Sequence, residues 1–332
     1  MARVPHRVSA IWVTWASQPR NCSMARELGV PMHKFEFRRG RAGRWLRASA
    51  ATIRLLWKTR PSVVFAPDPS LVLTYLLLLC RPFFRYRFVS DAHYGGVVDV
   101  RGSRLVQGLL DFANRHVDLV IVTNPRHADR VRLNGGISFV CPDPLPQFAG
   151  APAPPGGMNG AEKTVLFIGS YDADEPYREV FAAADILAER GFRVFASGRY
   201  SRVGISPASI PNAVLLGFVG RATYEAYLHN VDVVLDLTRW QDCLVCGAYE
   251  AMAAGKPCVL SRTTALTELF THGTVFCSHD PMDIADAVVA AYVQRAALKV
   301  QIESWVHQYH RATQARVSAL RDAMSLPQLS TN

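Results

Sequence analysis

The chain has 332 residues, enough for two domains of ordinary size, and its 49% hydrophobic and 19% charged composition excludes a disordered protein. The net charge of +10 is uneven, because residues 1–150 hold 22 Lys and Arg against 9 Asp and Glu, whereas residues 151–332 hold 15 against 18. We therefore expect a partner of the first half to be anionic, and membrane lipid and nucleic acid are the two candidates.

Export and membrane-spanning signals are absent from the sequence. The first residues lack the hydrophobic core of a signal peptide, and the longest apolar run, Leu71–Cys80, is about half a membrane span. Seven scattered cysteines fit a reducing compartment, so we expect a cytoplasmic protein. The pair Cys243-x-x-Cys246 has no second pair at ligand spacing, which favours apolar packing over a metal or redox site.

Apolar, β-branched runs alternate with helical segments through the first 145 residues. Strands are predicted at 7–14, 33–37, 62–66, 88–90, 118–123 and 137–141. Helices are predicted to end near Leu28 and Lys58, to span 71–80 and 102–116, and to begin at Pro125. Six strands that alternate with helices predict a Rossmann-like domain over residues 1–145.

Arginines gather with large apolar residues in two segments of this half. Residues 38–47 hold five arginines, and the helix that follows places Trp57 and Leu56 among further cations. The run 71–80 is likewise followed by arginines within 81–87. This pattern suits an anionic lipid surface, and the alternative is a solvated basic face over a core stripe. No nucleic-acid motif is recognisable, so we expect no nucleic-acid partner.

Polar residues follow the predicted strand 88–90, at Asp91 and His93. Such groups point into the ligand cleft of open α/β sheets, where Asp91 could contact an acceptor or act as a general base. A structural histidine is the alternative for His93. Arg20, in the loop after the first strand, has three interpretations: a phosphate contact, an acceptor contact or a surface arginine.

A segment rich in proline and glycine, residues 142–160, has the composition of a linker, and we place the linker at 146–162. Beyond it, strands are predicted at 164–168, 193–197, 213–218, 231–237, 258–260 and 274–277, with helices at 175–190, 223–229, 243–254 and, with breaks, from 280 to 324. The second Rossmann-like domain is expected over 163–300. The acids of Asp172-x-Asp174 lie at the start of a predicted helix, where capping is favoured over metal binding.

The stretch 242–261 reads as helix, tight turn and strand, with Asp242 at the mouth of the helix. Glu250 comes eight residues later, slightly over two turns, which predicts that both acids lie on one face. Gly255 and Pro257 end the helix. An ordinary amphipathic helix with an Asp cap and a solvated Glu is the alternative.

An acid, seven residues, a second acid and then Ala-Met-Ala-x-Gly-Lys-Pro-x-Val resembles the signature of the retaining GT-B nucleotide-sugar glycosyltransferases of family 4, also called glycosyltransferase group 1. The family usually has Glu where this chain has Asp242. The resemblance implies an α/β fold of two Rossmann-like domains that face each other across a cleft. It also implies a C-terminal helix, here 301–324, that packs back on the first domain.

The resemblance assigns roles to individual residues. Glu250 accepts hydrogen bonds from both ribose hydroxyls of the nucleotide, a task suited to two acceptor oxygens, while Asp242 and His93 lie near the transferred sugar. The remaining donor-binding candidates are Gly169, Ser170, Arg199, Phe218, Cys243, Leu244 and Val245.

Two family features are missing. No Gly-Gly pair follows the first strand, and acids stand at 172–175 where the family has a Lys-Gly pair. The sequence therefore does not identify the cations that face the donor diphosphate, and the candidates are Arg20, Arg199 and Lys256. Helix N-terminal amides near Leu244 could contribute further hydrogen bonds to the phosphates.

These patterns predict a hexosyltransferase with a UDP- or GDP-sugar donor and neither metal nor cofactor. The predicted acceptor is a lipid-linked sugar or glycolipid of cell-surface polysaccharide synthesis. We expect the basic half to hold the enzyme on the inner face of the membrane as a peripheral protein. Two alternatives are a nucleotide-sugar epimerase of the same fold and a catalytically silent, membrane-associated partner of a glycosyltransferase complex.

Overall fold

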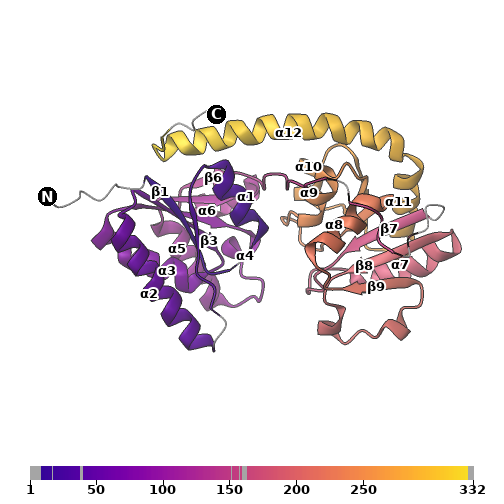
Figure 1. The fold of residues 1–332 in the computed structure, drawn as a ribbon, viewed down its shortest axis with the longest axis horizontal. Coiled ribbons are helices and arrows are strands. Elements are labelled where there is room, and N and C mark those ends of the chain that lie inside the picture. Colours follow the sequence, from indigo (N-terminus) through magenta and orange to yellow (C-terminus); the bar gives the residue numbers. More distant parts are fainter. Residues whose placement is uncertain are drawn as a thin grey trace. The chain divides into compact units, whose positions relative to one another are not determined.

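The computed structural model describes residues 9–16, 18–37, 40–150, 152–156, 158 and 163–327. The chain divides into two compact units, Met1–Pro144 together with Arg311–Asn332, and Leu145–His310. Each unit contains one six-stranded parallel sheet flanked by helices (Figure 1). Two Rossmann-like sheets, as the sequence predicts, are thus present.

The first unit has the strand order β2-β1-β3-β4-β5-β6. Its strands are β1 Ala10–Thr14, β2 Met32–Lys34, β3 Val63–Asp68, β4 Arg87–Ala92, β5 Leu119–Val122 and β6 Ser138–Val140. Its helices are α1 Pro19–Glu27, α2 Arg41–Thr59, α3 Leu71–Phe84, α4 Tyr94–Val97, α5 Arg104–His116 and α6 Pro125–Leu133, and the end of α12 Arg295–Ala323 belongs to the same unit.

Side-chain alternation along the strands builds a core on each face of this sheet. Ile11 and Val13 pack with residues of α2, α3 and α6, whereas Trp12 packs with residues of α1 and the end of α12. The ring of Trp12 stacks on that of Phe65 at 5.6 Å. Arg321 of α12 donates to the carbonyl of Leu28, so the C-terminal turns are tied to α1 as well as packed on the sheet.

The second unit has the strand order β12-β11-β10-β7-β8-β9. Its strands are β7 Lys163–Ile168, β8 Phe192–Ser197, β9 Ala213–Gly217, β10 Val233–Asp236, β11 Cys258–Ser261 and β12 Thr274–Cys277. Its helices are α7 Tyr177–Glu189, α8 Arg221–Asn230, α9 Cys246–Ala253, α10 Thr264–Leu269, α11 Pro281–Val293 and the first part of α12, with 3-10 turns η1 Tyr200–Val203 and η2 Pro207–Ser209.

The predicted linker behaves as part of the second unit in its described residues. Leu145, Phe148 and Met158 pack into the core that α8, α9 and α12 share. The boundary between the units therefore falls at Pro144. Predicted linker residues 151, 157 and 159–162 lie outside the described residues, as do Arg7 and Val8 of the first predicted strand and Arg38 and Arg39 of the basic segment.

Helix α9 begins at Cys246, three residues later than predicted. Residues 241–245 form a turn and an extended segment, and Val245 at the N-cap has φ −84° and ψ 139°. Asp242 thus precedes the helix, and the prediction that Asp242 and Glu250 share one helical face is wrong. Two further differences are the short α4, which the sequence analysis missed, and α3, which continues four residues beyond Cys80.

No helix in the described ranges combines the length and the apolar character that crossing a membrane requires. Helix α3, the most apolar candidate in the sequence, has 14 residues. It ends at Arg85, which adopts a left-handed conformation with φ 55°. Glycine is the usual residue at such a helix end, because side chains are disfavoured there.

We predict that Arg85→Gly leaves the free energy of unfolding unchanged or raises it by up to about 1 kcal/mol, because relief of the left-handed side chain outweighs the extra freedom of glycine in the unfolded chain. Urea denaturation of both proteins measures the difference. Arg87→Gly serves as the opposite control, since Arg87 lies in β4 and donates to Ala323. A clear loss of stability in Arg85→Gly would show that its side chain holds the fold.

Candidate functional site

The predicted donor residues gather at the carboxyl ends of the strands in the second unit. Loops after β7, β8, β9 and β10 hold most of them, and Glu250 lies in α9. Ligands of open parallel sheets bind at this edge. Arg20, Asp91 and His93 belong to the first unit, so the predicted residues form two groups, each described within its own unit.

Glu250 is half-buried in α9, and the hydroxyl of Tyr224 in α8 donates a short hydrogen bond to its Oε2. Burial raises the pKa of Glu250, an effect that the bond from Tyr224 opposes. Tyr224 thereby fixes the orientation of the carboxylate. The sequence analysis placed Tyr224 in a helix but missed this contact, because 26 residues separate the two side chains.

Asp236, at the end of β10, explains where α9 begins. Its buried carboxylate accepts a hydrogen bond from the amide of Gly247 at 2.8 Å, at the second residue of the helix. A side chain at position 247 would collide with this carboxylate and lie 2.7 Å from Cδ1 of Ile168. Burial raises the pKa of Asp236 well above its usual range, and the nearby Glu175 and Glu250 add to the shift. A strand residue therefore caps the helix in place of Asp242.

The three residues before α9 differ in exposure. Val245 is buried in the core of the second unit and Leu244 packs against that core. Cys243 is half-buried, and burial raises the pKa of its thiol to about 12. None of the three lies within the helix, which begins at Cys246, and the amide of Gly247 in its first turn is bound by Asp236. That helix N-terminal amides near Leu244 contact a phosphate stays a prediction. Cys246 is exposed, which corrects its expected role in apolar packing.

In the loop after β7, backbone amides bind the carboxylate of Glu175 from the same loop. Glu175 accepts hydrogen bonds from the amides of Ser170 (2.9 Å) and Tyr171 (2.8 Å) and from the hydroxyl of Ser170 (2.6 Å). Tyr171 is left-handed with φ 61°, which turns consecutive amides toward one acceptor. Burial raises the pKa of Glu175. A protein carboxylate thus binds both the amide and the hydroxyl of Ser170, one of the predicted donor-binding residues.

The acids of Asp172-x-Asp174 precede α7 and do not cap it, contrary to prediction. Asp174 accepts a hydrogen bond from the hydroxyl of Thr238 at 2.6 Å, and Asp172 accepts from Ser170 and pairs with Arg202. These contacts join the loop after β7 to the loop after β10. In the described part of the chain, no group of three or more His, Cys, Asp or Glu side chains is arranged to hold a metal ion.

Arg199 and Phe218 form an exposed pair beyond the ends of β8 and β9. The guanidinium of Arg199 lies over the ring of Phe218, 4.6 Å from its centroid, and Phe218 is 75% exposed. A flat apolar ring beside a cation offers stacking and charge in one place. Lys256 precedes β11 and therefore lies at the opposite, amino edge of the parallel sheet, so its candidacy as a diphosphate contact fails on position.

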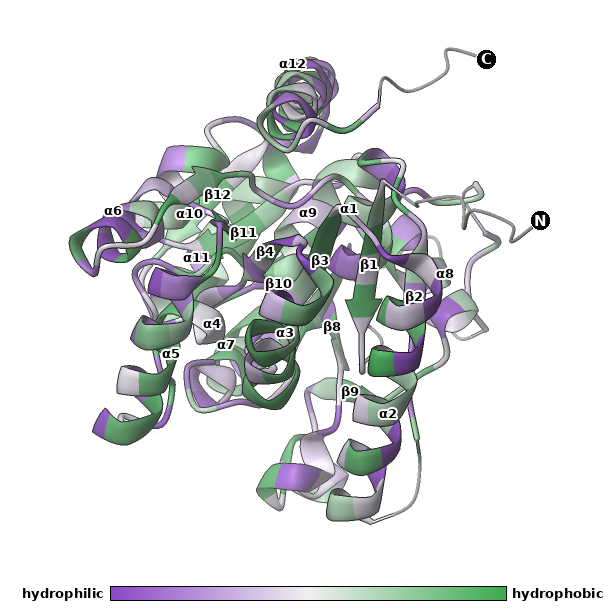
Figure 2. Ribbon diagram, turned by 90° about the vertical axis from the view of Figure 1, so that its left-hand side faces the viewer, coloured by the Kyte–Doolittle hydropathy of each residue, from purple (hydrophilic) through white to green (hydrophobic). Residues whose placement is uncertain are grey.

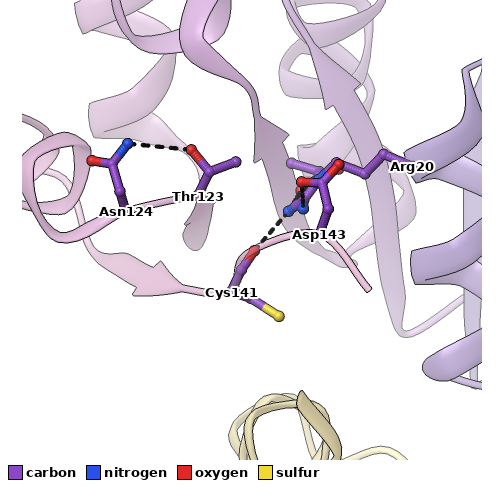
Figure 3. Close-up of polar contacts among 6 residues, drawn as sticks. Arg20, Thr123, Asn124, Cys141 and Asp143 are labelled. Atoms are coloured by element: carbon purple, nitrogen blue, oxygen red, sulfur yellow. Dashed lines mark hydrogen bonds and ion pairs between the residues drawn. The ribbon is translucent and has the colours of Figure 1, made fainter. Parts of the chain in front are cut away.

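In the first unit, Arg20 forms a buried ion pair with Asp91, and its guanidinium also meets Asp143 and the carbonyl of Cys141 (Figure 3). Nη2 of Arg20 lies 2.6 Å from Asp91, Nη1 lies 2.5 Å from Asp143, and Nη2 also donates to the carbonyl of Cys141. All three guanidinium nitrogens are engaged, and Asp91 has no exposed side-chain surface. The structure therefore makes Asp91 an ion-pair partner and not an accessible base, and it makes Arg20 a link between α1, β4 and the chain after β6.

His93 and Asp68 mark the carboxyl ends of β4 and β3. The amide of His93 donates to the carbonyl of Asp68 at 3.2 Å, and Asp68 accepts from the amide of Ser70 at 2.8 Å. Within the described residues, Nε2 of His93 and Oδ2 of Asp68 are buried without a hydrogen-bond partner. Burial raises the pKa of Asp68 to about 7. Buried polar atoms without partners are costly, which makes this strand edge the functional candidate of the first unit.

The sequence analysis did not single out Asp68, which comes just after the predicted strand 62–66. The signal that could have found it is its place between two prolines, Pro67 and Pro69, at a strand's carboxyl end. Gly96 packs against the same backbone, since a side chain there would lie 3.0 Å from the carbonyl of Asp68. The structure thus replaces Asp91 with Asp68 as the acid beside His93.

A comparison with protein-family models matches the part of the second unit that contains the stretch 242–261. The family model described as glycosyl transferases group 1 matches residues 161–294. A search of curated proteins returned no match to the sequence. The prediction of a glycosyltransferase is thereby confirmed at the level of this domain.

Solved structures match along nearly the whole chain. Sucrose-phosphate synthase from Thermosynechococcus elongatus has a TM-score of 0.70 at 14% identity over 96% of each chain. HepE from Anabaena, in complex with UDP-glucose, has a TM-score of 0.71 at 12% identity over 95% of this chain and all of that one. UDP-GlcNAc 2-epimerase from Methanocaldococcus jannaschii has a TM-score of 0.54 at 10% identity over 85% and 92%. At these identities the likeness shows the fold, and the predicted GT-B fold is confirmed.

We predict that Asp68→Asn changes how stability depends on pH. A carboxyl whose pKa is about 7 when folded and near 4 when unfolded binds more protons in the folded state, so its contribution to the free energy of unfolding falls as pH rises from 4 to 7. The side chain of Asn does not titrate, so the free energy of unfolding of the variant should lack this decrease between pH 4 and 7. Urea denaturation across pH 4–8 measures it, with the exposed Asp129→Asn as control. Parallel profiles for wild type and Asp68→Asn would contradict the raised pKa.

Proposed function

We propose that the chain is a retaining glycosyltransferase that transfers a sugar from a UDP- or GDP-sugar to a lipid-linked sugar or glycolipid in cell-surface polysaccharide synthesis. The observation that carries the proposal is Glu250, held by Tyr224 at the carboxyl edge of the sheet, inside the segment that matches the glycosyltransferase model. The HepE structure, which contains UDP-glucose, makes a UDP-sugar the first donor to test.

Glu250 has the properties needed to bind a ribose diol. A carboxylate offers two acceptor oxygens, and vicinal hydroxyls can donate to both. Hydrogen bonds to the charged form lower a pKa, so ribose binding would oppose the upward shift that burial imposes on Glu250. Donor affinity should consequently fall when the pH is lowered through the raised pKa of the free protein.

The remaining donor contacts in this proposal come from the loops around Glu250. Phe218 and Arg199 would lie beside the base and the diphosphate, and Asp242 beside the transferred sugar. Transfer would depend on positioning of the two substrates and on stabilisation of the departing diphosphate. We propose no metal or cofactor and no covalent protein nucleophile. The first unit, with His93 and Asp68 at its strand edge, would bind the acceptor.

The acceptor assignment is supported by charge. The first 150 residues carry a net charge of +13, and lipid-linked acceptors are anchored in membranes whose inner face is anionic. A peripheral enzyme on that face would meet both its soluble donor and its membrane acceptor.

We predict that one nucleotide sugar stabilises the wild-type protein in a thermal-shift panel of UDP-, GDP-, ADP- and dTDP-sugars. A ligand at a hundred times its dissociation constant adds about 2.7 kcal/mol. Glu250→Ala should abolish the shift, and Tyr224→Phe should weaken affinity by about threefold to tenfold because the carboxylate loses its orienting bond. Glu189→Ala, at the exposed last residue of α7, is the control. Equal shifts in wild type and Glu250→Ala would remove Glu250 from the donor site.

One observation favours a second candidate, the catalytically silent partner. The amides of Ser170 and Tyr171 already hold Glu175, and Asp172 and Asp174 stand next to them, so this loop presents negative charge where the family presents cations. Like charges repel one another, so this loop would oppose the approach of a diphosphate. A silent partner would need no nucleotide sugar at all.

We predict that Glu175→Gln raises donor affinity by about threefold to tenfold, because the variant removes a negative charge beside the diphosphate. Isothermal titration of the donor found in the panel measures the change, and Glu189→Gln, at the exposed last residue of α7, is the control. If neither wild type nor Glu175→Gln binds any donor, the chain is a silent partner and the transferase proposal fails.

The fold-level likeness to an epimerase calls for one further assay. Incubation of the bound nucleotide sugar alone, followed by NMR, would reveal a change of configuration on the sugar ring if the chain is an epimerase. A transferase leaves the donor sugar's configuration intact until an acceptor is added.

A further inference from the structure

Helix α2 has two apolar faces, and only one of them lies in the core. Ala48 and Leu56 are buried against the sheet. Leu46, Ile53 and Trp57 are exposed, with 72% of Leu46 and 68% of Trp57 open to solvent. Their spacing of seven and four residues aligns them along one outer stripe of the helix. A soluble helix normally turns polar residues outward, so this outer stripe is available to a partner.

Helices α3 and α5 show the same feature. On α3, Leu79 and Phe83 are 70% and 78% exposed at a spacing of four residues, and on α5 Leu105 and Phe112 are exposed at a spacing of seven. Figure 2 shows α3 hydrophobic over most of its length and α2 with hydrophobic and hydrophilic residues interleaved. The α2–α3–α5 face is defined by the exposed residues Leu46, Ile53, Trp57, Val72, Leu79, Phe83, Leu105, Leu109 and Phe112.

Aromatic contacts join the three helices into one surface. Trp57 of α2 meets Phe84 of α3 edge to face at 6.3 Å. Tyr75 of α3 stacks on Phe112 of α5 at 6.2 Å and donates its hydroxyl to the carbonyl of Leu109 at 2.9 Å. The apolar stripes are therefore held side by side.

A groove of about 480 Å³ runs between α3 and α5 on this surface. Aromatic and aliphatic side chains line it, among them Tyr75, Leu79 and Phe112. Two arginines also line it: Arg85, which is exposed, and Arg81, which is paired with Asp118. Its volume and lining suit part of an amphiphile, with apolar contacts inside and positive charge near an anionic group.

The charge of the three helices has one sign. Residues 41–60, 71–85 and 104–116 hold ten Lys and Arg and a single acid, Asp111. The carboxylate of Asp111 is engaged with Gln107 and Asn134. Arg47, Arg54 and Lys58, again at spacings of seven and four, form a cationic line beside the exposed apolar line of α2. Large apolar side chains thus alternate with cations across the whole face.

We propose that the α2–α3–α5 face docks on an anionic lipid bilayer. The exposed Phe, Leu and Trp side chains would enter the boundary between headgroups and acyl chains, and the Lys and Arg side chains would pair with lipid phosphates. The docking deepens the proposed function, because a membrane acceptor would then meet the unit that binds it. Binding to lipid itself requires no glycosyl transfer.

Charge selects a bilayer over a second copy of the chain. Two copies meeting through this face would bring the exposed cations of both copies together, among them Arg47, Arg54 and Lys58, and like charges across an interface are strongly disfavoured. An anionic bilayer neutralises the same cations. It also accepts isolated side chains such as Phe83 without a shaped partner surface.

Co-sedimentation of the full chain with vesicles tests the proposal. One set of vesicles contains phosphatidylcholine alone, and the other contains phosphatidylcholine with 30% phosphatidylglycerol as the probe; about this share gives a surface potential in the range of anionic membranes. The variants are Phe83→Ser, which removes an exposed apolar side chain, and Arg85→Gly, which removes a cation where glycine suits the backbone. The controls are Val300→Ser and Lys299→Gln, exposed residues of α12 in the second unit.

We expect the wild type to bind the anionic vesicles and not the neutral ones, with binding that weakens as salt increases. Phe83→Ser should lower the partition coefficient by about tenfold and Arg85→Gly by about fivefold, while the controls match the wild type. Four outcomes would overturn the proposal: no vesicle binding, equal binding to both vesicle types, equal loss in controls and test variants, or a dimer in light scattering that Phe83→Ser dissociates.

The donor panel on the same preparations separates the two proposals. Loss of vesicle binding with intact donor binding refutes the docking face and leaves the transferase standing. Vesicle binding without any donor binding refutes the transferase and leaves the docking face standing.

Discussion

The hydrogen bond between the carboxylate of Asp236 and the amide of Gly247 is the constraint on which the candidate donor site depends. It ends β10 and begins α9 at one point, and it admits only glycine at position 247. Once the helix starts there, Glu250 lies one turn further on, within reach of Tyr224. This arrangement buries the carboxyl group of Asp236 near Glu175 and Glu250, and its pKa is consequently raised well above its usual range. The position of Glu250, the proposed ribose-binding carboxylate, is thus set by the carboxylate of Asp236, which has no predicted contact with the donor.

The order of strands and helices could be predicted from the sequence, because it is written in local patterns. Apolar β-branched runs and helical periods located all twelve strands within a few residues, and the resemblance around Glu250 led to the fold that the solved structures share. The start of α9 could not be found in this way. Its cap comes from Asp236, eleven residues upstream on another element, while Asp242 stands at the position where a local cap would be expected. A tertiary contact leaves no periodic signal.

Ion pairing explains why the polar residues of the first unit were harder to assign. Asp91 lies near the carboxyl end of β4 and Arg20 lies in α1, which follows β1, and each alone has the chemistry of a site residue. In the fold they neutralise one another, with Asp143 and the carbonyl of Cys141 completing the shell around the guanidinium. Seventy-one residues separate the pair, so neither charge could be discounted from the sequence. Asp68 shows the converse, since its buried Oδ2 lacks a partner among the described residues.

Burial also separates the two kinds of positive charge in the first unit. Arg20 and Arg321 are buried and donate hydrogen bonds to acceptors within the protein. They therefore stabilise the fold and contribute little to the electrostatic potential at the protein surface. Arg47, Arg54 and Lys58 of α2 and Arg85 at the end of α3 are exposed, and exposed aromatic and aliphatic side chains of the same helices surround them. A basic surface that contacts only water does not explain the exposed Phe83 and Leu79. An apolar patch alone does not explain the surrounding arginines. A partner that is anionic at its surface and apolar just beneath would satisfy both features together, and the proposed lipid bilayer has these properties.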